Sequence, residues 1–282
     1  MTATPDGILV GYDGSAASEH ALGWAAREAR SRGLALTVCQ AWAPGLPEPA
    51  APVLDSARRS GELVLAAGMR SARALMGPGE VRPLLAGRTA VAALTDHSRS
   101  ADMVVLGCRG RGGMSGLLLG SVSAQVAALA CGRVVVVRGH WRPAGGYNPG
   151  PVVVGADGSA ASDAAVAFAF EEAALREAPL LAVCALSDMP GCLGEAHGLR
   201  EKFDRALDRW EKELPEVVVR RHVAVGAARG ALLAAAGGAQ LLAVGSRGRG
   251  GLRGMMLGSV SQAVLAHAAC PVAVVHPAAR PG

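Results

Sequence analysis

The sequence predicts an α/β protein made of two copies of one domain. Short apolar runs alternate along the chain with segments of helical periodicity. The stretch Gly107-Cys108-Arg109-Gly110 recurs as Gly245-Ser246-Arg247-Gly248, and in both copies Gly-Ser follows after nine further residues. Each copy comes after an apolar run and before a helical run of small residues. The order strand, glycine loop, helix therefore occurs twice.

The first copy begins with an apolar run that enters the turn Asp13-Gly14-Ser15. Ser15 or Ser18 can cap the next helix, which should stop at Gly33. Prolines at 44, 47, 49 and 52 then interrupt regular structure. The strands expected in this copy are 7–11, 34–41, 81–86, 103–107 and 134–138, and the helices are 15–33, about 55–75, 89–97 and 121–130.

The second copy repeats this order after a Pro/Gly-rich stretch at 140–150. Its expected strands are 151–155, 180–186, 217–225, 241–245 and 272–276, and its helices are 163–178, 195–214, 231–236 and 260–269. The offset between copies is 157 − 13 = 144 at the acidic turn and 245 − 107 = 138 at the glycine loop. We therefore predict domains at 1–139 and 151–282 with a linker at 140–150, each with a parallel sheet built from βαβ units.

The composition fits a globular chain with two cores, since 51% of the 282 residues are hydrophobic and 18% are charged. The 28 basic and 23 acidic residues give a net charge of +5, which is too diffuse for a nucleic-acid footprint. Aromatic residues make up only 3%, so no stacking platform for single strands is visible. We therefore expect no nucleic-acid partner.

The cysteines and the N-terminus favour a cytoplasmic protein. The six cysteines stand singly, without C-x-x-C or matching histidine spacing, so neither a zinc site nor a disulfide scaffold is expected. Residues 1–6 lack a basic-then-apolar signal, and no apolar run reaches the length of a membrane span.

The glycine loops point to phosphate. Gly107, Gly110 and Gly120 would permit positive φ and close approach of the backbone to an anion, and Ser121 and Ser123 could add hydroxyl donors. The arginines of the two loops could add charge-assisted bonds; these are Arg109, Arg111, Arg247 and Arg249. A flexible loop with solvated arginines is the alternative for the glycines, and helix capping is the alternative for Asp13 and Asp157. Two intact copies favour a two-site nucleotide binder.

The sequence does not have the residue spacing of other known phosphate-binding and catalytic motifs. G-x-x-x-x-G-K-[ST] is absent, and Gly110-x-Gly112 lacks the third glycine of the dinucleotide fingerprint. Gly113-Met114-Ser115-Gly116 misses the nucleophile elbow, because Leu117 stands where glycine is needed. No residues supply a general base for water attack on a γ-phosphate. We expect no enzyme, or slow ATP hydrolysis at most.

The spacing Gly-x-x-Gly, nine residues, Gly-Ser, preceded by Val-Gly-x-Asp-Gly-Ser, resembles the ATP-binding class of the universal stress proteins, here in tandem. The resemblance implies two Rossmann-like domains similar to the adenine nucleotide alpha hydrolases, with open five-stranded parallel sheets of order 3-2-1-4-5. It implies one ATP per domain, with Mg²⁺. The nucleotide-binding residues it implies are Gly11, Asp13, Gly14, Ser15, Ala41, Gly107, Arg109, Gly110, Gly120, Ser121, Val122 and Ser123, and in the second copy Gly155, Asp157, Gly158, Ser159, Ala185, Gly245, Arg247, Gly248, Gly258, Ser259, Val260 and Ser261.

The family also implies a regulatory role in the stress response, with an unknown protein partner. Domains of such proteins often pair through their last strands, so 134–137 and 272–275 are expected to form an internal pseudo-dimer, with a homodimer as a further option. The segments 43–53 and 188–198 differ between the copies, so the two affinities should differ. The alternatives are a nucleotide-dependent transferase or hydrolase of this fold, and a protein scaffold with vestigial sites.

Overall fold

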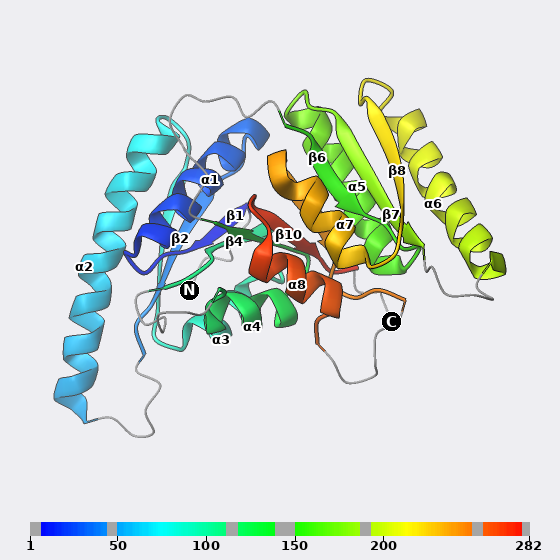
Figure 1. Cartoon of the computed structure of the whole chain (residues 1–282). Coiled ribbons are helices and arrows are strands. Elements are labelled where there is room, and N and C mark those ends of the chain that lie inside the picture. Colours follow the sequence, from blue (N-terminus) through cyan, green and yellow to red (C-terminus); the bar gives the residue numbers. More distant parts are fainter. Residues whose placement is uncertain are drawn as a thin grey trace. The chain divides into compact units, whose positions relative to one another are not determined.

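The structure is a computed structural model that describes residues 7–43, 50–110, 118–138, 150–186, 193–249 and 256–277. The chain divides into two compact units, Met1–Ala144 and Gly145–Gly282 (Figure 1). Of the predicted linker, only Gly150 is among the described residues. The prolines at 44, 47 and 49 and the loop residue Arg111 also lie outside them.

The first unit has the predicted alternation of strands and helices. Its strands are β1 (Ile8–Gly11), β2 (Leu36–Ala41), β3 (Val81–Ala86), β4 (Met103–Gly107) and β5 (Arg133–Val137), and its helices are α1 (Ala16–Arg32), α2 (Ala51–Met76), α3 (Ala90–His97) and α4 (Ser121–Leu129). The strands are parallel in the order β3-β2-β1-β4-β5, which confirms the expected order 3-2-1-4-5.

The second unit repeats the first. Its strands are β6 (Val152–Gly155), β7 (Leu180–Leu186), β8 (Val219–Val225), β9 (Leu241–Gly245) and β10 (Val272–Val275), and its helices are α5 (Ala160–Leu175), α6 (Leu193–Glu213), α7 (Ala228–Ala235) and α8 (Ser259–His267). A single 3₁₀ turn, η1 (Ala236–Gly238), follows α7. The parallel order β8-β7-β6-β9-β10 is the same topology.

Helices cover both faces of each sheet. In the first unit α1 and α2 pack on one face of the sheet, and α3 and α4 pack on the other (Figure 1). In the second unit one face is covered by α5 and α6, and the other by α7 and α8 (Figure 1). The central strands are apolar along their whole length, as in Val104 to Leu106 and Leu241 to Val244, and are buried. Continuous apolar strands are expected where both faces of a parallel sheet are covered.

The predicted cap of the first helix is confirmed in the first unit, and the second unit repeats it with a helix that begins three residues before the expected start. The Ser15 hydroxyl accepts a hydrogen bond from the backbone N–H of Ser18, and α1 ends at Gly33 with a left-handed φ of 65°. In the second unit the Ser159 hydroxyl accepts from the N–H of Ser162. The first strand of each unit therefore enters its helix through a fixed turn.

The predicted start of the second helix is wrong by about a turn. We expected Pro52 to interrupt regular structure, but α2 begins at Ala51 with proline in its first turn. Proline is tolerated there because the first N–H groups of a helix have no intrahelical partner.

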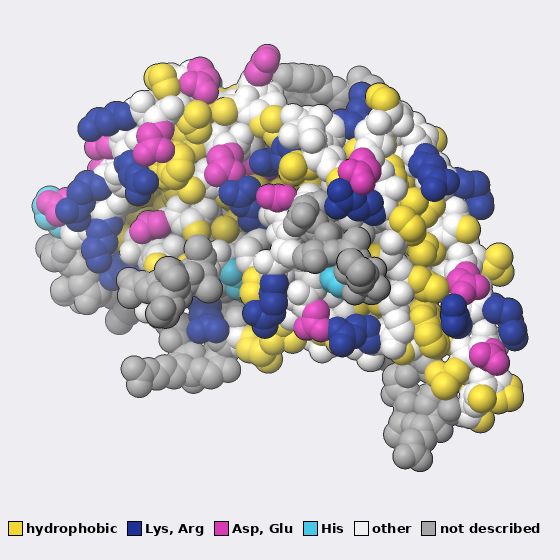
Figure 2. All heavy atoms as spheres, turned by 180° about the vertical axis from the view of Figure 1, so that it is seen from behind, with side chains coloured by type: hydrophobic (Ala, Val, Ile, Leu, Met, Phe, Trp, Pro, Cys, Tyr) yellow, Lys and Arg dark blue, Asp and Glu magenta, His cyan; other side chains and the backbone are white. Residues whose placement is uncertain are grey.

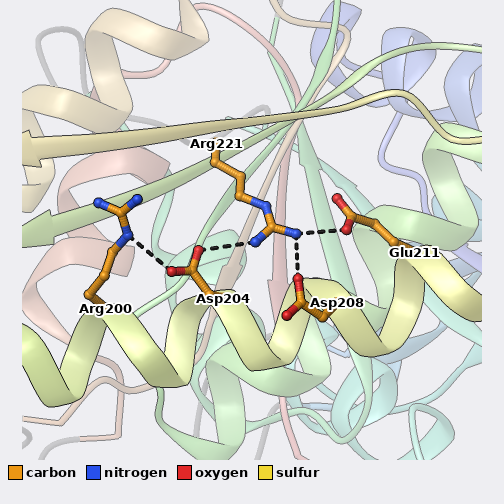
Figure 3. Close-up of polar contacts among 5 residues, drawn as sticks. All are labelled: Arg200, Asp204, Asp208, Glu211 and Arg221. Carbon is orange, nitrogen blue, oxygen red and sulfur yellow. Dashed lines mark hydrogen bonds and ion pairs between the residues drawn. The ribbon is translucent and has the colours of Figure 1, made fainter.

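Ion pairs hold the edge strand of the second unit to its neighbouring helix (Figure 3). Arg221 on β8 donates to Asp204 Oδ1 at 3.1 Å, and to Asp208 Oδ1 and Glu211 Oε2 at 2.6 Å each, all on α6. Arg200, one turn before Asp204, donates to its other oxygen at 3.1 Å. Partial burial alone would lower the pKa of Arg221, but the hydrogen bonds that it donates to Asp208 and Asp204 and the charge of Glu211 raise this pKa overall.

Candidate functional site

Each unit has a pocket at the carboxyl ends of its first and fourth strands. Ligands of open α/β sheets bind at this point, where the strand order reverses. The pocket of the first unit has a volume of about 290 Å³ and that of the second about 490 Å³. In both, the floor is the strand ends and one wall is the glycine loop with the helix that follows it.

The pockets bring together most of the residues that the sequence singled out. The lining of the first includes Gly11, Asp13, Ala41, Gly107, Arg109, Gly110, Gly120, Ser121, Val122 and Ser123. The lining of the second includes Gly155, Asp157, Ala185, Gly245, Arg247, Gly248, Gly258, Ser259, Val260 and Ser261. Gly14, Ser15, Gly158 and Ser159 are not part of these walls; they form the turns behind the aspartates.

The aspartate of each unit lies against its glycine loop. Asp13 Oδ1 accepts from the N–H of Ser15 at 3.0 Å, and Asp157 Oδ1 accepts from the N–H of Ser159 at 3.1 Å. Asp157 Oδ2 also accepts from the N–H of Arg249 in the loop, at 2.9 Å. Each carboxylate thus has a fixed position between the first turn and the loop.

The serine after each aspartate ties the same two segments together. The Ser15 hydroxyl lies 3.5 Å from the carbonyl of Arg109, and the Ser159 hydroxyl 3.3 Å from that of Arg247. Ser15 and Ser159 were predicted to bind nucleotide. In the structure they cap a helix and donate to the loop backbone, so they support the site from behind.

The loop glycines are needed for close approach, and Gly107, Gly110 and Gly120 do not adopt the positive φ that glycine permits. A Cβ on Gly107 would lie 2.5 Å from the carbonyl oxygen of Ala17, and one on Gly110 would lie 2.6 Å from Asp13 Oδ2. Gly245 and Gly248 repeat both contacts in the second unit. The positive φ occurs instead in the acidic turns, at Gly14 (76°) and Gly158 (71°), because the chain reverses there between strand and helix.

The serines at the third helical position are also used differently from expectation. The Ser123 hydroxyl donates to the carbonyl of Gly107 and the Ser261 hydroxyl to that of Gly245, each at 2.7 Å. Both serines are buried. They fix the helix against the strand end and leave Ser121 and Ser259, which are exposed, as the hydroxyls available to a ligand.

The helix beyond each loop begins without a side-chain cap. Gly120 is the N-cap residue of α4 and Gly258 that of α8, and neither has a side-chain hydrogen bond to the first turn. Their own N–H groups close the loop by donating to Cys108 and Ser246 carbonyls at 2.8 Å. The next N–H groups of each helix lie at the pocket wall, where they and the helix dipole favour an anion.

Sequence reasoning missed the apolar wall and the differences between the pockets. Leu94 and Leu106 line the first pocket, and Leu232 and Val244 the second. The register sets Cys39 opposite Gly11 but Val183 opposite Gly155, and burial raises the pKa of the Cys39 thiol to about 12. Counting residues inward from the strand ends would have found this wall.

Charged side chains of both signs are mixed on the surface (Figure 2), and metal-ligating side chains do not cluster among the described residues. Basic and acidic side chains are interspersed over the face seen in Figure 2. No group of three or more His, Cys, Asp or Glu residues that could hold a metal ion occurs among the described residues. Within the same residues no helix is long and apolar enough to cross a membrane.

Comparison with known proteins decides the family. The model of the universal stress protein family matches residues 6–138 and again 150–276. A universal stress protein of Mycolicibacterium smegmatis is 39% identical over 297 aligned positions, which cover 98% of this chain and 99% of that protein. The chain belongs to the universal stress protein family. It is a tandem member, with one family repeat in each unit.

Other relatives agree with this assignment. A universal stress protein of Mycobacterium tuberculosis is 38% identical, with 95% of this chain and 94% of that protein covered. A crystal structure of a universal stress protein from Archaeoglobus fulgidus superposes with a TM-score of 0.73 at 20% identity, covering 96% and 98% of the two chains. This likeness shows that the fold is that of a tandem universal stress protein.

Proposed function

We propose that each unit of this universal stress protein binds an adenine nucleotide with its phosphates on the glycine loop. The nucleotide that we propose is ATP. The observation that carries the proposal is the repeated junction of an uncapped helix N-terminus, a glycine loop and an aspartate at one pocket. Backbone N–H groups at such a junction suit phosphate oxygens. All twenty-four predicted residues would then belong to the two sites, with the acidic-turn glycines and serines in supporting positions.

The apolar side of each pocket suits the base. Ala41 and Leu94 in the first unit, and Ala185 and Leu232 in the second, line the wall away from the glycine loop. Apolar walls with a few polar groups are typical of small-molecule sites. Adenine on this wall would leave the ribose near the aspartate and the phosphates at the loop.

Mg²⁺ fits as a partner of the nucleotide rather than as a resident ion. Asp13 and Asp157 are the acidic residues among those lining the pockets. Mg²⁺ is usually bound through one or two carboxylates together with substrate phosphates. In the second unit both Asp157 oxygens already accept one N–H each, and a carboxylate oxygen has a further lone pair for a metal or its water.

The role we propose is regulatory, in the cytoplasm and with little or no hydrolysis. Nucleotide occupancy would change the surface that a partner protein or a second copy recognises. We keep 1–139 and 151–282 as the domains, 140–150 as the linker, and pairing of β5 with β10 as the internal pseudo-dimer. Rapid ATP turnover that Asp13→Asn abolishes would contradict the regulatory role and favour a transferase or hydrolase.

The proposal is tested by identifying what the protein carries. Mass spectrometry of the small molecules released on denaturation should find ATP or a related adenine nucleotide. Added ATP should raise the melting temperature, because a ligand that binds only the folded state stabilises it. A protein that carries no nucleotide and whose melting temperature is unchanged by millimolar ATP would refute the proposal.

A further inference from the structure

The second unit has another hollow, of about 540 Å³, between α5 and α6. Its wall on α6 carries Lys202, Arg205, Arg209 and Trp210, and its wall on α5 carries Asp163. It is separate from the nucleotide pocket described above, whose lining includes none of these side chains.

A tyrosine ring occupies the equivalent place in the first unit. The buried stripe of α2 matches that of α6 at an offset of 138, as in Leu65 and Phe203 (203 − 65 = 138). In the first unit the ring of Tyr12 lies over Gly68, where a Cβ would be 2.7 Å from the ring, and its hydroxyl donates to Glu19. The counterparts by the same offsets are Ala156, Ala206 and Asp163. The second unit has no tyrosine at this place, and its hollow is open.

The open hollow is basic. Lys202 and Arg205 are exposed, and neither forms an ion pair with any residue that the structure describes. Arg209 pairs with Glu213 at 3.3 Å and lies over the Trp210 ring at 5.5 Å. Asp163 is the opposing charge: burial first and then the nearby Asp157 raise its pKa, while Lys202 lowers it. Two cations without an ion pair to any described residue, and Arg209 with its partner Glu213, therefore lie opposite Asp163.

The hollow adjoins the nucleotide pocket at one corner. Gly158 lines the hollow, and the residue before it, Asp157, lines the pocket. A Cβ on Gly158 would lie 3.1 Å from the Lys202 side chain and 3.7 Å from that of Leu199, which lines the pocket. The nucleotide pocket and the hollow are thus separated by the acidic turn and the N-terminal part of α6.

We propose that the α5–α6 hollow of the second unit is an anion site that takes a phosphate group, held by Lys202 and Arg205. The phosphate comes either from a separate phosphorylated small molecule or from a nucleotide that carries a phosphate away from the glycine loop. In the first unit the Tyr12 ring occupies this place, so we expect no such site there. Two repeats of one fold would therefore bind different sets of ligands.

The test uses inorganic tripolyphosphate, titrated calorimetrically into the full chain. Lys202→Gln with Arg205→Gln should remove one tripolyphosphate site or weaken it about a hundredfold, roughly tenfold for each charge-assisted hydrogen bond that the substitutions remove. The matched control is Arg200→Gln with Lys212→Gln, which removes the same charges from α6 outside the hollow and should leave binding unchanged. Equal binding by both double variants and the unaltered chain would overturn the proposal.

A second variant tests shape without changing charge. Ala156→Tyr with Ala206→Gly copies the Tyr12 and Gly68 pair of the first unit and should close the hollow. Retention of full tripolyphosphate binding by this variant, with its fold verified by circular dichroism, would also overturn the proposal.

Adding ATP distinguishes the two sources of phosphate. ATP at saturation should remove tripolyphosphate from the glycine loops. A tripolyphosphate site that remains, and that the Lys202→Gln, Arg205→Gln variant lacks, indicates a separate phosphorylated molecule. Displacement by ATP, together with weaker ATP binding in the Lys202→Gln, Arg205→Gln variant, indicates a phosphate of the nucleotide itself. Failure of ATP to bind at all would refute the proposed function and leave the result with tripolyphosphate standing.

Discussion

At the scale of single residues, two glycines of one loop should respond differently to the same methyl group. A Cβ on Gly107 would lie 2.5 Å from the backbone of Ala17, whereas one on Gly110 would meet only the end of the Asp13 side chain. Backbone cannot move aside cheaply, but a carboxylate can rotate. The first glycine therefore supports the fold and the second supports the position of the aspartate.

We expect Gly107→Ala to lower the free energy of unfolding by about 1–3 kcal/mol, as overpacking does. Gly110→Ala should change it by less than about 0.5 kcal/mol and weaken nucleotide binding about tenfold. Chemical denaturation and a binding titration measure the two effects. Gly230→Ala is the control, since a Cβ there meets nothing within 4 Å; equal stability of the Gly107→Ala and Gly230→Ala variants would contradict this account.

The thiol in the first pocket should be inert. Burial raises the pKa of Cys39 from 9.0 to about 12, so at pH 8 the reactive thiolate is almost absent. We expect iodoacetamide at pH 8 to label the half-exposed Cys108 well before Cys39, as peptide mass spectrometry would show. Labelling of both at the same rate in the folded protein would contradict the burial.

The same shift makes the folded state less stable in alkali. The pKa of Cys39 is higher in the folded state than in the unfolded state. The stability that comes from burying the neutral thiol is therefore fully present below pH 9 and is lost progressively between about pH 9 and 12. Cys39→Ser should flatten this part of the stability profile. If the free energy of unfolding falls with pH as steeply in that variant as in the unaltered protein, Cys39 is not the source of the pH dependence.

At the scale of elements, the edge of the second unit depends on one arginine. Arg221 is the donor to three carboxylates that lie on successive turns of α6. Replacing it leaves those carboxylates close together and without this cation. Because the group is partly exposed, solvent screens the effect.

We expect Arg221→Met to lower the free energy of unfolding by about 1 kcal/mol at low salt and by less at 1 M salt, where the Debye length is about 3 Å. Hydrogen exchange should accelerate first in α6 and β8. The Arg220→Met variant on the same strand is the comparison, since its side chain points away from this network along the alternating strand. Equal destabilisation by both variants at both salt concentrations would argue against the network.

At the scale of the whole molecule, the sequence predicted the architecture well because apolar periodicity, helix caps and turn residues all indicated the same order of strands and helices. Apolar runs, serine caps and a terminal glycine all predicted the same helices and strands. Helix α1, for example, begins after Ser15 and ends before Gly33, as expected. The start of α2 was missed because proline is a breaker inside a helix but is compatible with its first turn.

The structure brings most of the predicted site residues to one pocket in each unit, and their roles in binding a nucleotide stay predictions. Spacing identified Asp13, Gly110 and Ser123 as neighbours of one pocket, but it could not show which groups a side chain bonds. In the structure the Ser123 hydroxyl donates to the Gly107 carbonyl, a bond that spacing does not predict. The replacement of Tyr12 by Ala156 was equally visible in the sequence, yet its effect depends on what the ring covers.

Isothermal titration of the full chain with ATP and Mg²⁺ tests the central claim most directly. Two equivalents should bind per chain, and Gly110→Ala or Gly248→Ala should each weaken one of them and leave the other unchanged. Absence of binding, or a single equivalent that neither substitution affects, would contradict it.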